Sequence, residues 1–272
     1  MPFAQLNDVE IYYELEGIGP DVLVISGTGS DLRIPRLPNR DFDDSYHIVR
    51  YDHRGLGQSS SSERPVTMEQ FAHDAASLLD FLSIVSVDVI GISFGGMVAQ
   101  HLAIQYPHKV KKLVLACTSA GGEGNSSADL LSLMQLSKSN RQQKWLNMYD
   151  RRYGNVDNEN LFVHTLDRLL QQEPGLFPNK VMPGLLHQLK ARSEHDVSKS
   201  LEKITHPCLV VGGEFDAIAP PDNLTYLSEH IPLADLHFFK GGHSFLWEDP
   251  MAWVTISTFL KKDGLLFEYA QK

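Results

Sequence analysis

Residues 89–100 read VIGISFGGMVAQ and place Ser93 inside a Gly-x-Ser-x-Gly pentad. Beta-branched residues precede Ser93, and a run that favours helix follows it. Gly91, Gly95 and Gly96 are small enough for a strand and a helix to approach closely at a sharp turn. We therefore predict a buried strand, a strained turn at Ser93, and a helix that begins directly after it.

The segments on either side of this turn alternate between strand and helix patterns. Residues 3–15 predict a hairpin that turns at Asn7 and Asp8. A helix opens at Thr67, which forms a capping box with Gln70, and the helix after Ser93 stops before Pro107. Continuous apolar runs predict buried strands at residues 21–27, 46–52, 87–92 and 113–116. This alternation predicts an α/β fold with a mostly parallel wound sheet, flanking helices and right-handed crossovers.

Residues 123–200 break the alternation. Apolar side chains recur at helical spacing around Leu130, Trp145, Leu161 and Leu185, and no run in this interval reads as a strand. An all-helical segment inside a parallel-sheet domain is most simply a cap over one end of the sheet. We therefore predict a helical cap insertion at residues 123–200.

The alternation of strand and helix resumes after the insertion. Strand and helix patterns follow one another at residues 206–216, 221–230, 236–239 and 250–260. Asp249 precedes Pro250 and is predicted to cap the last helix. The α/β core is accordingly expected to consist of residues 1–122 and 201–272.

Composition narrows the possible partners. The chain has 272 residues, 42% hydrophobic and 21% charged, with a formal net charge of −10. No window holds the ~18 uninterrupted apolar residues of a membrane span, and the first residues lack a secretory pattern. The negative charge argues against nucleic acid or an anionic membrane as partner. We expect a cytoplasmic protein that acts on a small molecule, and no pattern indicates an oligomeric state.

The cysteine content suggests neither disulfide nor metal chemistry. Cys117 and Cys208 are the only two cysteines, and each lies within an apolar run. Their positions match no metal-binding spacing, and we predict no metal site. Buried reduced thiols are therefore the expected state of both side chains.

Two strand ends after Ser93 carry the partners that a nucleophilic serine needs. A serine hydroxyl requires a base to take its proton, and the base requires a carboxylate. His243 and Asp216 each follow a predicted strand and a glycine pair, at the edge where functional groups gather in open α/β sheets. The order Ser93, Asp216, His243 matches one family of known triads. Two alternatives stay open: Glu214 in place of Asp216, and a structural role for the serine, since Gly-x-Ser-x-Gly alone arises by chance in on the order of one chain in ten.

A tetrahedral intermediate would also need donors for its oxyanion. The backbone N–H of Phe94 follows the nucleophile at a helix start and is the first predicted donor. The second is the backbone N–H of Thr28, in a loop that Gly27 and Gly29 allow to come close. A plain glycine turn is the alternative interpretation of that loop.

These motifs together resemble the alpha/beta-hydrolase fold superfamily over nearly the whole chain. The resemblance rests on the pentad at 91–95, on YDHRGLGQS at 51–59, on Asp216 and on GGHSFLWEDP at 241–250. It implies an eight-stranded sheet, a Ser-Asp-His triad and no cofactor. Many members carry His-Gly before the oxyanion residue, where this chain has Ser26-Gly27.

Within the superfamily, the sequence is similar to small capped esterases, enol-lactone hydrolases and carbon–carbon bond hydrolases. Epoxide hydrolases and haloalkane dehalogenases of this fold use aspartate where Ser93 stands, so serine favours acyl transfer. Asp52 and Arg54, in the motif at residues 51–59, are interpreted as structural. We predict a serine hydrolase that cleaves a carboxylic ester or lactone of a small, largely apolar substrate through an acyl-enzyme.

Two other functions are open at this stage. The first is hydrolysis of a carbon–carbon bond in a beta-diketone-type substrate, for which Arg151, Arg152 or Arg168 would bind a substrate carboxylate. The second is a non-catalytic, ligand-binding member of the fold. Aromatic and Met side chains of the cap are candidate walls of a substrate pocket, with the helical core as the alternative: Trp145, Met148, Tyr149 and Phe162.

Overall fold

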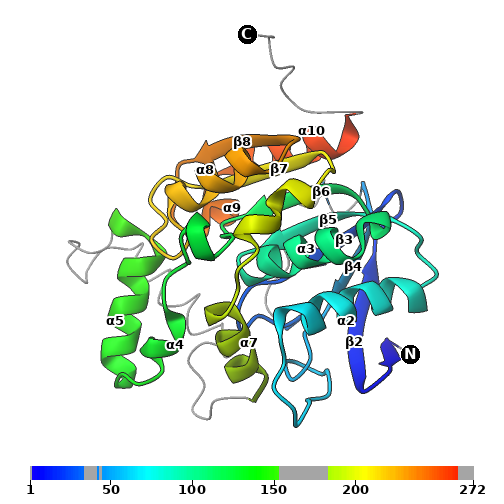
Figure 1. Ribbon diagram of the computed structural model, residues 1–272, viewed down its shortest axis with the longest axis horizontal. Coiled ribbons are helices and arrows are strands. Elements are labelled where there is room, and N and C mark those ends of the chain that lie inside the picture. The colour runs from blue at the N-terminus through cyan, green and yellow to red at the C-terminus, as the bar shows by residue number, and fades with distance from the viewer. Residues whose placement is uncertain (1, 34–41, 43–44, 153–182, 263–272) are drawn as a thin grey trace.

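The chain folds as one eight-stranded sheet with helices on both faces (Figure 1). The computed structural model describes residues 2–33, 42, 45–152 and 183–262. The strands are β1 (Phe3–Leu6), β2 (Val9–Glu16), β3 (Asp21–Ile25), β4 (His47–Tyr51), β5 (Val87–Ile92), β6 (Val110–Ala116), β7 (Cys208–Gly213) and β8 (Ala234–Phe239). The longer helices are α2 (Met68–Phe81), α3 (Phe94–Gln105), α5 (Lys138–Tyr149), α7 (Pro183–Ser193), α8 (Pro221–His230) and α10 (Pro250–Lys261). Shorter helical segments are η1 (Pro107–Lys109), η2 (Gly122–Gly124), α4 (Leu130–Leu133), η4 (Ser198–Lys203) and α9 (Phe245–Glu248).

The strand order places the four loops after β3, β5, β7 and β8 at one edge of the sheet. The order is β1-β2-β4-β3-β5-β6-β7-β8, and every pair from β4 to β8 is parallel. The predicted hairpin is confirmed, because β1 and β2 are antiparallel and Leu6 pairs with Val9 across the turn. Since β3 lies beside β5, and β7 beside β8, the loops that leave their carboxyl ends meet above the sheet. The α/β class predicted from the sequence is therefore confirmed.

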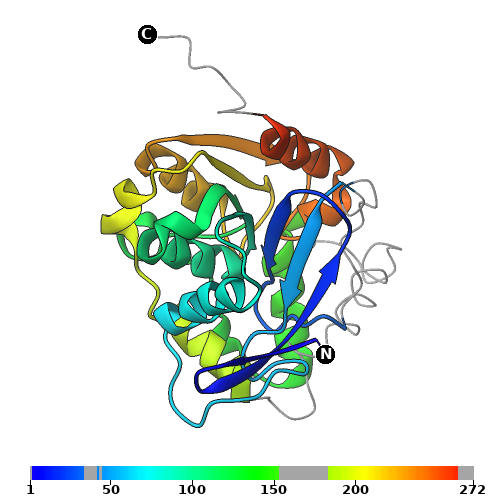
Figure 2. The ribbon, with the colours of Figure 1, turned by 90° about the vertical axis from the view of Figure 1, so that its right-hand side faces the viewer.

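Both faces of the sheet are buried, which explains the continuous apolar runs. Successive residues of a strand point to opposite faces. Leu23 and Val89 belong to the apolar cluster that includes α2 and α3, whereas their neighbours Val24 and Ile90 belong to the cluster that includes α10. The two views place α2 and α3 on one face and α10 on the other (Figure 1, Figure 2). A parallel sheet covered in this way forms a rigid base for the loops at its edge.

Two helix starts follow the predicted capping chemistry. The Thr67 hydroxyl accepts a hydrogen bond from the Gln70 N–H, at 3.3 Å, at the start of α2. The Asp249 carboxylate accepts one from the Met251 N–H, at 2.9 Å, at the start of α10. Each cap satisfies an N–H group that has no partner within its helix. The cap at Asp249 is confirmed. At Thr67 the hydroxyl caps the helix, but the Gln70 side-chain amide donates to Asp74 Oδ1 at 3.2 Å and does not close the predicted capping box.

Among the described residues, the α-helices α4, α5 and α7 lie between β6 and β7 in the chain, and they are grouped together in Figure 1. We call them the inserted helices. They share an apolar cluster with two loops of the sheet, and its buried members are Leu56, Leu130, Leu133, Trp145, Leu185, Leu189 and Ile218. The predicted helix around Leu161 lies outside the described residues. The division into core and cap stays a prediction.

The sequence predicts buried, reduced cysteines and no membrane span. Cys117 and Cys208 are both free and buried, as predicted. Burial raises the pKa of both thiols, so both are protonated at neutral pH. Among the described residues, no helix combines the length and apolar character that crossing a bilayer requires.

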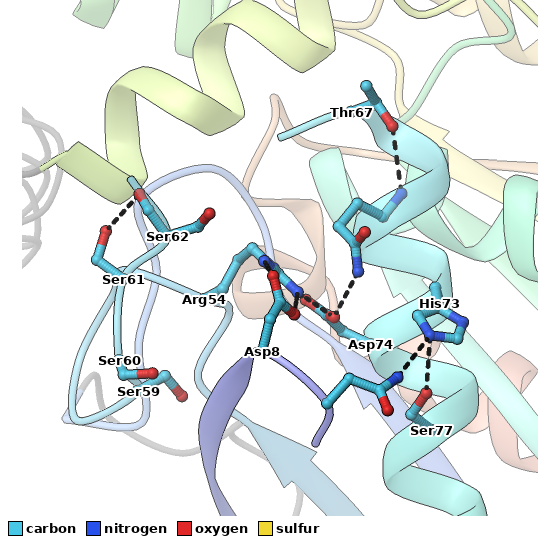
Figure 3. Close-up of polar contacts among 12 residues, drawn as sticks. Asp8, Arg54, Ser59, Ser60, Ser61, Ser62, Thr67, His73, Asp74 and Ser77 are labelled. Carbon is cyan, nitrogen blue, oxygen red and sulfur yellow. Dashed lines mark hydrogen bonds and ion pairs between the residues drawn. The ribbon is translucent and has the colours of Figure 1, made fainter. Parts of the chain in front are cut away.

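A buried ion pair holds the motif at residues 51–59 against α2. The Arg54 guanidinium donates two hydrogen bonds of 2.6 Å to the Asp74 carboxylate, and both side chains are almost fully buried. The half-exposed Asp8 carboxylate accepts weaker bonds, at 3.2 and 3.4 Å, from the same guanidinium (Figure 3). Burial alone would lower the pKa of Arg54, but the two carboxylates raise it above its ordinary value. Arg54 therefore has the structural role that we predicted.

Asp74→Asn is expected to lower the free energy of unfolding by about 3–5 kcal/mol, because it leaves a buried guanidinium without its main counter-charge. Asp8→Asn removes the exposed carboxylate from the same cation and is expected to cost less than about 1 kcal/mol. Urea unfolding, followed by tryptophan fluorescence and circular dichroism, measures both variants. Equal losses for the two would contradict the dominance of the Arg54–Asp74 pair.

Candidate active site

Ser93 occupies a strained turn between β5 and α3. Its φ and ψ are 54° and −114°, in a region that residues other than glycine rarely adopt. The Ser93 N–H donates to the Ala116 carbonyl at 2.8 Å, and the Thr118 hydroxyl donates to the Ser93 carbonyl at 2.8 Å. These bonds to the end of β6 and the loop behind it hold a conformation that costs on the order of 1–3 kcal/mol. Such a turn presents its side chain at the carboxyl edge of the sheet.

The glycines around Ser93 are required by close packing. A Cβ at Gly95 would lie 2.0 Å from the Ile25 carbonyl oxygen, and one at Gly96 would lie 2.6 Å from the Thr118 Cβ. A Cβ at Gly91 would lie 2.5 Å from the carbonyl oxygen of Gly95. Each distance is shorter than a Cβ can tolerate, so larger residues would move α3 away from the sheet. The sequence-based explanation of these glycines is confirmed.

Three side chains from distant parts of the sequence form one hydrogen-bonded chain. The Ser93 Oγ lies 2.9 Å from His243 Nε2, and His243 Nδ1 lies 2.7 Å from Asp216 Oδ2. Ser93 is 6% exposed and Asp216 is 0% exposed, so the carboxylate at the far end is shielded from water. With Nδ1–H donating to the carboxylate, Nε2 is free to accept the serine proton. The arrangement can therefore move a proton from a hydroxyl to an imidazole.

The loop after β7 fixes the Asp216 carboxylate. Its Oδ1 accepts hydrogen bonds from the backbone N–H groups of Ile218, at 2.7 Å, and Ala219, at 3.0 Å. The other oxygen, Oδ2, is thereby directed to the imidazole of His243. Glu214, the alternative acid, has an exposed side chain at the start of the same loop. The structure thus brings Asp216, and not Glu214, to the histidine.

Main-chain groups at the end of α5 bind the loops of both Asp216 and His243. The His243 N–H donates to the Tyr149 carbonyl at 2.6 Å, and the Ala217 N–H donates to the Met148 carbonyl at 3.0 Å. The Tyr149 ring also meets the imidazole edge to face, with 5.6 Å between ring centroids. A Cβ at Gly242 would lie 2.3 Å from the Tyr149 carbonyl oxygen, which explains the glycine before the histidine. No side-chain pattern could have predicted these backbone contacts.

The candidate pocket residues have different surroundings. Trp145 is 4% exposed and lies within the apolar cluster of the inserted helices. Met148 and Tyr149 are half-buried at the edge of that cluster. Phe162 lies outside the described residues. Their predicted contact with substrate stays a prediction.

Arg152 is committed to two carboxylates. It donates to the fully buried Asp150, with Nε at 2.9 Å from Oδ1, and to Glu248 at 3.1 Å. Its guanidinium also lies 4.5 Å from the centroid of the Phe215 ring. Arg152 is therefore a link between α5 and α9 in this structure, and not the carboxylate anchor suggested as one alternative. The side chain of Arg151 is exposed, and Arg168 lies outside the described residues.

The loop after β3 reaches the serine. A Cβ at Gly27 would lie 3.5 Å from the Ser93 Cβ, so the loop backbone passes directly beside the hydroxyl. Within residues 2–33, 42, 45–152 and 183–262, the backbone N–H groups of Thr28 and Phe94 have no hydrogen-bond acceptor. Two N–H groups without partners beside a nucleophile are what an oxyanion site requires.

The motif at residues 51–59 supports the loop after β3 from within the fold. Asp52 Oδ1 accepts a hydrogen bond from the Leu32 N–H at 2.7 Å, and His53 Nε2 lies 3.2 Å from the Ser26 carbonyl oxygen. Burial lowers the pKa of His53 to about 4, so the ring is neutral and Nε2–H donates. Asp52 therefore has the structural role that we predicted, whereas the contact of His53 was not foreseen.

Two further contacts to the loop were missed. Gln188 Oε1 accepts a hydrogen bond from the Gly29 N–H at 2.7 Å, and Arg192 Nη1 donates to the Thr28 hydroxyl at 3.2 Å. Both side chains belong to α7 and are separated by one helical turn. In the sequence, these contacts are indicated only by two polar residues, four positions apart, on an otherwise apolar face of α7.

The described part of the chain contains no group of three or more His, Cys, Asp or Glu side chains that could hold a metal ion. The side chains gathered at the loop edge are an alcohol, an imidazole and a carboxylate. Their chemistry is that of proton transfer and nucleophilic attack.

Comparison with known proteins agrees with this architecture. The family model described as alpha/beta hydrolase fold matches residues 22–250. The chain is 30% identical over 233 residues to a poly(3-hydroxyalkanoate) depolymerase of Ectopseudomonas oleovorans, covering 83% of this chain and 78% of the relative. It is 28% identical over 254 residues to 3-oxoadipate enol-lactonase 2 of Acinetobacter baylyi, covering 90% of this chain and 91% of the relative. The crystal structure of the enol-lactonase from Burkholderia xenovorans LB400 superposes with a TM-score of 0.81 at 21% identity, covering 96% of this chain and 100% of the other. The chain therefore belongs to the alpha/beta hydrolase fold family.

Proposed function

We propose that this protein is a serine hydrolase that cleaves a carboxylic ester or lactone of a small, largely apolar substrate through an acyl-enzyme. The observation that carries the proposal is the hydrogen-bonded chain from Ser93 through His243 to Asp216. The names of two relatives, a poly(3-hydroxyalkanoate) depolymerase and an enol-lactonase, denote cleavage of ester and lactone bonds. They support the same bond class for this chain.

In the first half of the reaction, the Ser93 oxygen attacks the carbonyl carbon while His243 Nε2 takes the hydroxyl proton. The carbonyl oxygen becomes an oxyanion, which the N–H groups of Thr28 and Phe94 would stabilise. One such donor is worth about 2.7–4 kcal/mol in a serine protease. The imidazolium then protonates the leaving alkoxide, the carbon–oxygen bond breaks, and the acyl group remains on Ser93.

In the second half, water replaces the alcohol. His243 takes a proton from the water as its oxygen attacks the acyl carbon, and it then returns the proton to the Ser93 oxygen as the acid leaves. Asp216 keeps the imidazole oriented and stabilises its cationic form in both halves. Water is the co-reactant that these steps consume, and the three side chains return to their starting protonation states.

The surroundings favour an apolar substrate. The apolar cluster of the inserted helices includes Ile218, two residues after the catalytic carboxylate, and has Met148 and Tyr149 at its edge. Side chains of this kind would bind hydrocarbon parts of an acid or alcohol. Of the arginines named for the carbon–carbon hydrolase alternative, Arg152 is bound to Asp150 and Glu248.

A fluorophosphonate probe is expected to label the wild-type protein and to spare Ser93→Ala, because the probe reacts with a serine that a neighbouring base activates. Mass spectrometry of the digested protein would locate the adduct on the peptide that contains Ser93. Ser61→Ala, at an exposed serine on another loop, serves as the control and should label fully. Labelling that persists in Ser93→Ala would overturn the proposed nucleophile.

A further inference from the structure

Arg192 is a buried cation without a counter-charge in its immediate contacts. In the described part of the chain, its guanidinium binds three neutral oxygens: Thr28 Oγ1 at 3.2 Å, Ser127 Oγ at 2.7 Å and the Ala128 carbonyl at 3.4 Å. Burial lowers its pKa to about 10, so the side chain is still cationic at neutral pH. Burying a charge without an ion-pair partner costs stability. Its position therefore calls for a functional explanation.

Gln188 lies one turn earlier on α7 and is 0% exposed. Its Oε1 accepts the Gly29 N–H, while its Nε2 is buried without a hydrogen-bond partner among the described residues. The Gly29 N–H is thereby removed from the set of possible oxyanion donors. The Thr28 N–H has no acceptor among the described residues, and it is the predicted donor from this loop.

The loop contains Gly27 and Gly29, whose backbones are less restricted than those of other residues. Gly29 has a φ of 73°, and the loop passes beside Ser93 at Gly27. α7 holds two consecutive residues of this loop, Thr28 by its hydroxyl and Gly29 by its N–H. A donor must be held within about 0.5 Å of its productive place to stabilise an oxyanion well.

We propose that Arg192 and Gln188 are positioning residues of the oxyanion site: they fix the Thr28 N–H through the loop, and the Arg192 charge stabilises the negative charge that develops on the substrate oxygen. This inference rests on the proposed serine hydrolase function. A fixed cation in a buried site interacts strongly with a charge that appears only in the transition state. It interacts weakly with an uncharged ester, so its loss lowers kcat much more than it raises KM.

The test compares variants that separate charge from contact. Arg192→Met is expected to lower kcat for p-nitrophenyl butyrate on the order of 10²-fold with KM changed less than about threefold. Gln188→Glu retains an acceptor for the Gly29 N–H but places a carboxylate one turn from Arg192. It is expected to lower kcat on the order of tenfold, because that carboxylate neutralises the local positive charge. Lys190→Met removes an exposed cation from the same helix and should leave kcat unchanged.

A second readout distinguishes electrostatic positioning from a purely structural role. Butaneboronic acid forms a tetrahedral anion on an active serine, whereas butyramide stays neutral. Binding of the boronic acid to Arg192→Met and Gln188→Glu should weaken in proportion to the loss of kcat, and binding of butyramide should not change. Because Gln188→Glu introduces no unpaired charge, it keeps the test valid if Arg192→Met fails to fold.

Wild-type kcat and boronic acid affinity in Gln188→Glu, or in a folded Arg192→Met, would overturn the inference. Equal weakening of boronic acid and butyramide would also overturn it, because a distorted pocket would then explain the result. The parallel measurement of Ser93→Ala keeps the two proposals apart. If Ser93→Ala is inactive while the α7 variants behave as wild type, the serine hydrolase proposal stands and only the role of α7 is wrong.

Discussion

His243→Ala is expected to lower kcat/KM for short p-nitrophenyl esters by at least on the order of 10³-fold, and up to about 10⁶-fold, the size of the kcat loss when the triad histidine of a serine protease is removed. The reason is geometric. His243 Nε2 lies 2.9 Å from the Ser93 Oγ, and no second imidazole of the described residues forms a hydrogen bond with that oxygen. Without the base, the serine must attack as a neutral alcohol.

Initial rates over a range of ester concentrations would measure this loss, and circular dichroism would establish that the variant is folded. His230→Ala provides a matched control, because His230 is an exposed histidine at the end of α8. Its activity should equal that of the wild type. A folded His243→Ala variant that retains wild-type kcat/KM would rule out the proposed base.

Asp216→Asn is expected to lower kcat on the order of 10⁴-fold, as the same change does in a serine protease. An amide at this position can donate to the imidazole and thereby favour the wrong tautomer, with the proton on Nε2. The hydrogen bonds from Ile218 and Ala219 to Oδ1 would hold the amide in nearly the place of the carboxylate. The loss would therefore report on charge and tautomer rather than on lost packing.

Glu214→Gln is the matched comparison for Asp216→Asn, because it makes the same chemical change on the same loop. Glu214 is exposed and Asp216 is 0% exposed, so we expect wild-type kcat for Glu214→Gln. Both variants would be assayed with the same esters under the same conditions. The opposite pattern, with only Glu214→Gln impaired, would transfer the acid role to Glu214.

Residues at strand ends could be predicted from sequence because two local rules determine their place. Apolar runs locate the parallel strands, and the carboxyl ends of such strands lie at one edge of the sheet. Ser93, Asp216 and His243 each follow such a run, and the structure places the three in one hydrogen-bonded chain. Close packing explains the glycines beside them equally well.

The contacts that the inserted helices make could not be predicted by such rules. Apolar spacing predicted helices near Leu130, Trp145 and Leu185, but it does not specify how a short helix rotates against a loop 100 or more residues away. The contact of Gln188 with Gly29 depends on that rotation, with a sequence separation of 159. The carbonyl contacts of Met148 and Tyr149 carry no side-chain signature at all.

The backbone bonds from the end of α5 limit how this enzyme could be re-engineered. A chimera that exchanges residues 123–200 for the equivalent segment of a relative would replace the two carbonyls that hold the loops of Asp216 and His243. Graft junctions placed after Arg152 and before α7 would retain those bonds, the link from Arg152 to Asp150 and Glu248, and the contacts of Gln188 and Arg192 with the loop after β3. Substrate range could then be altered in the transplanted part while the proton-transfer geometry is inherited unchanged.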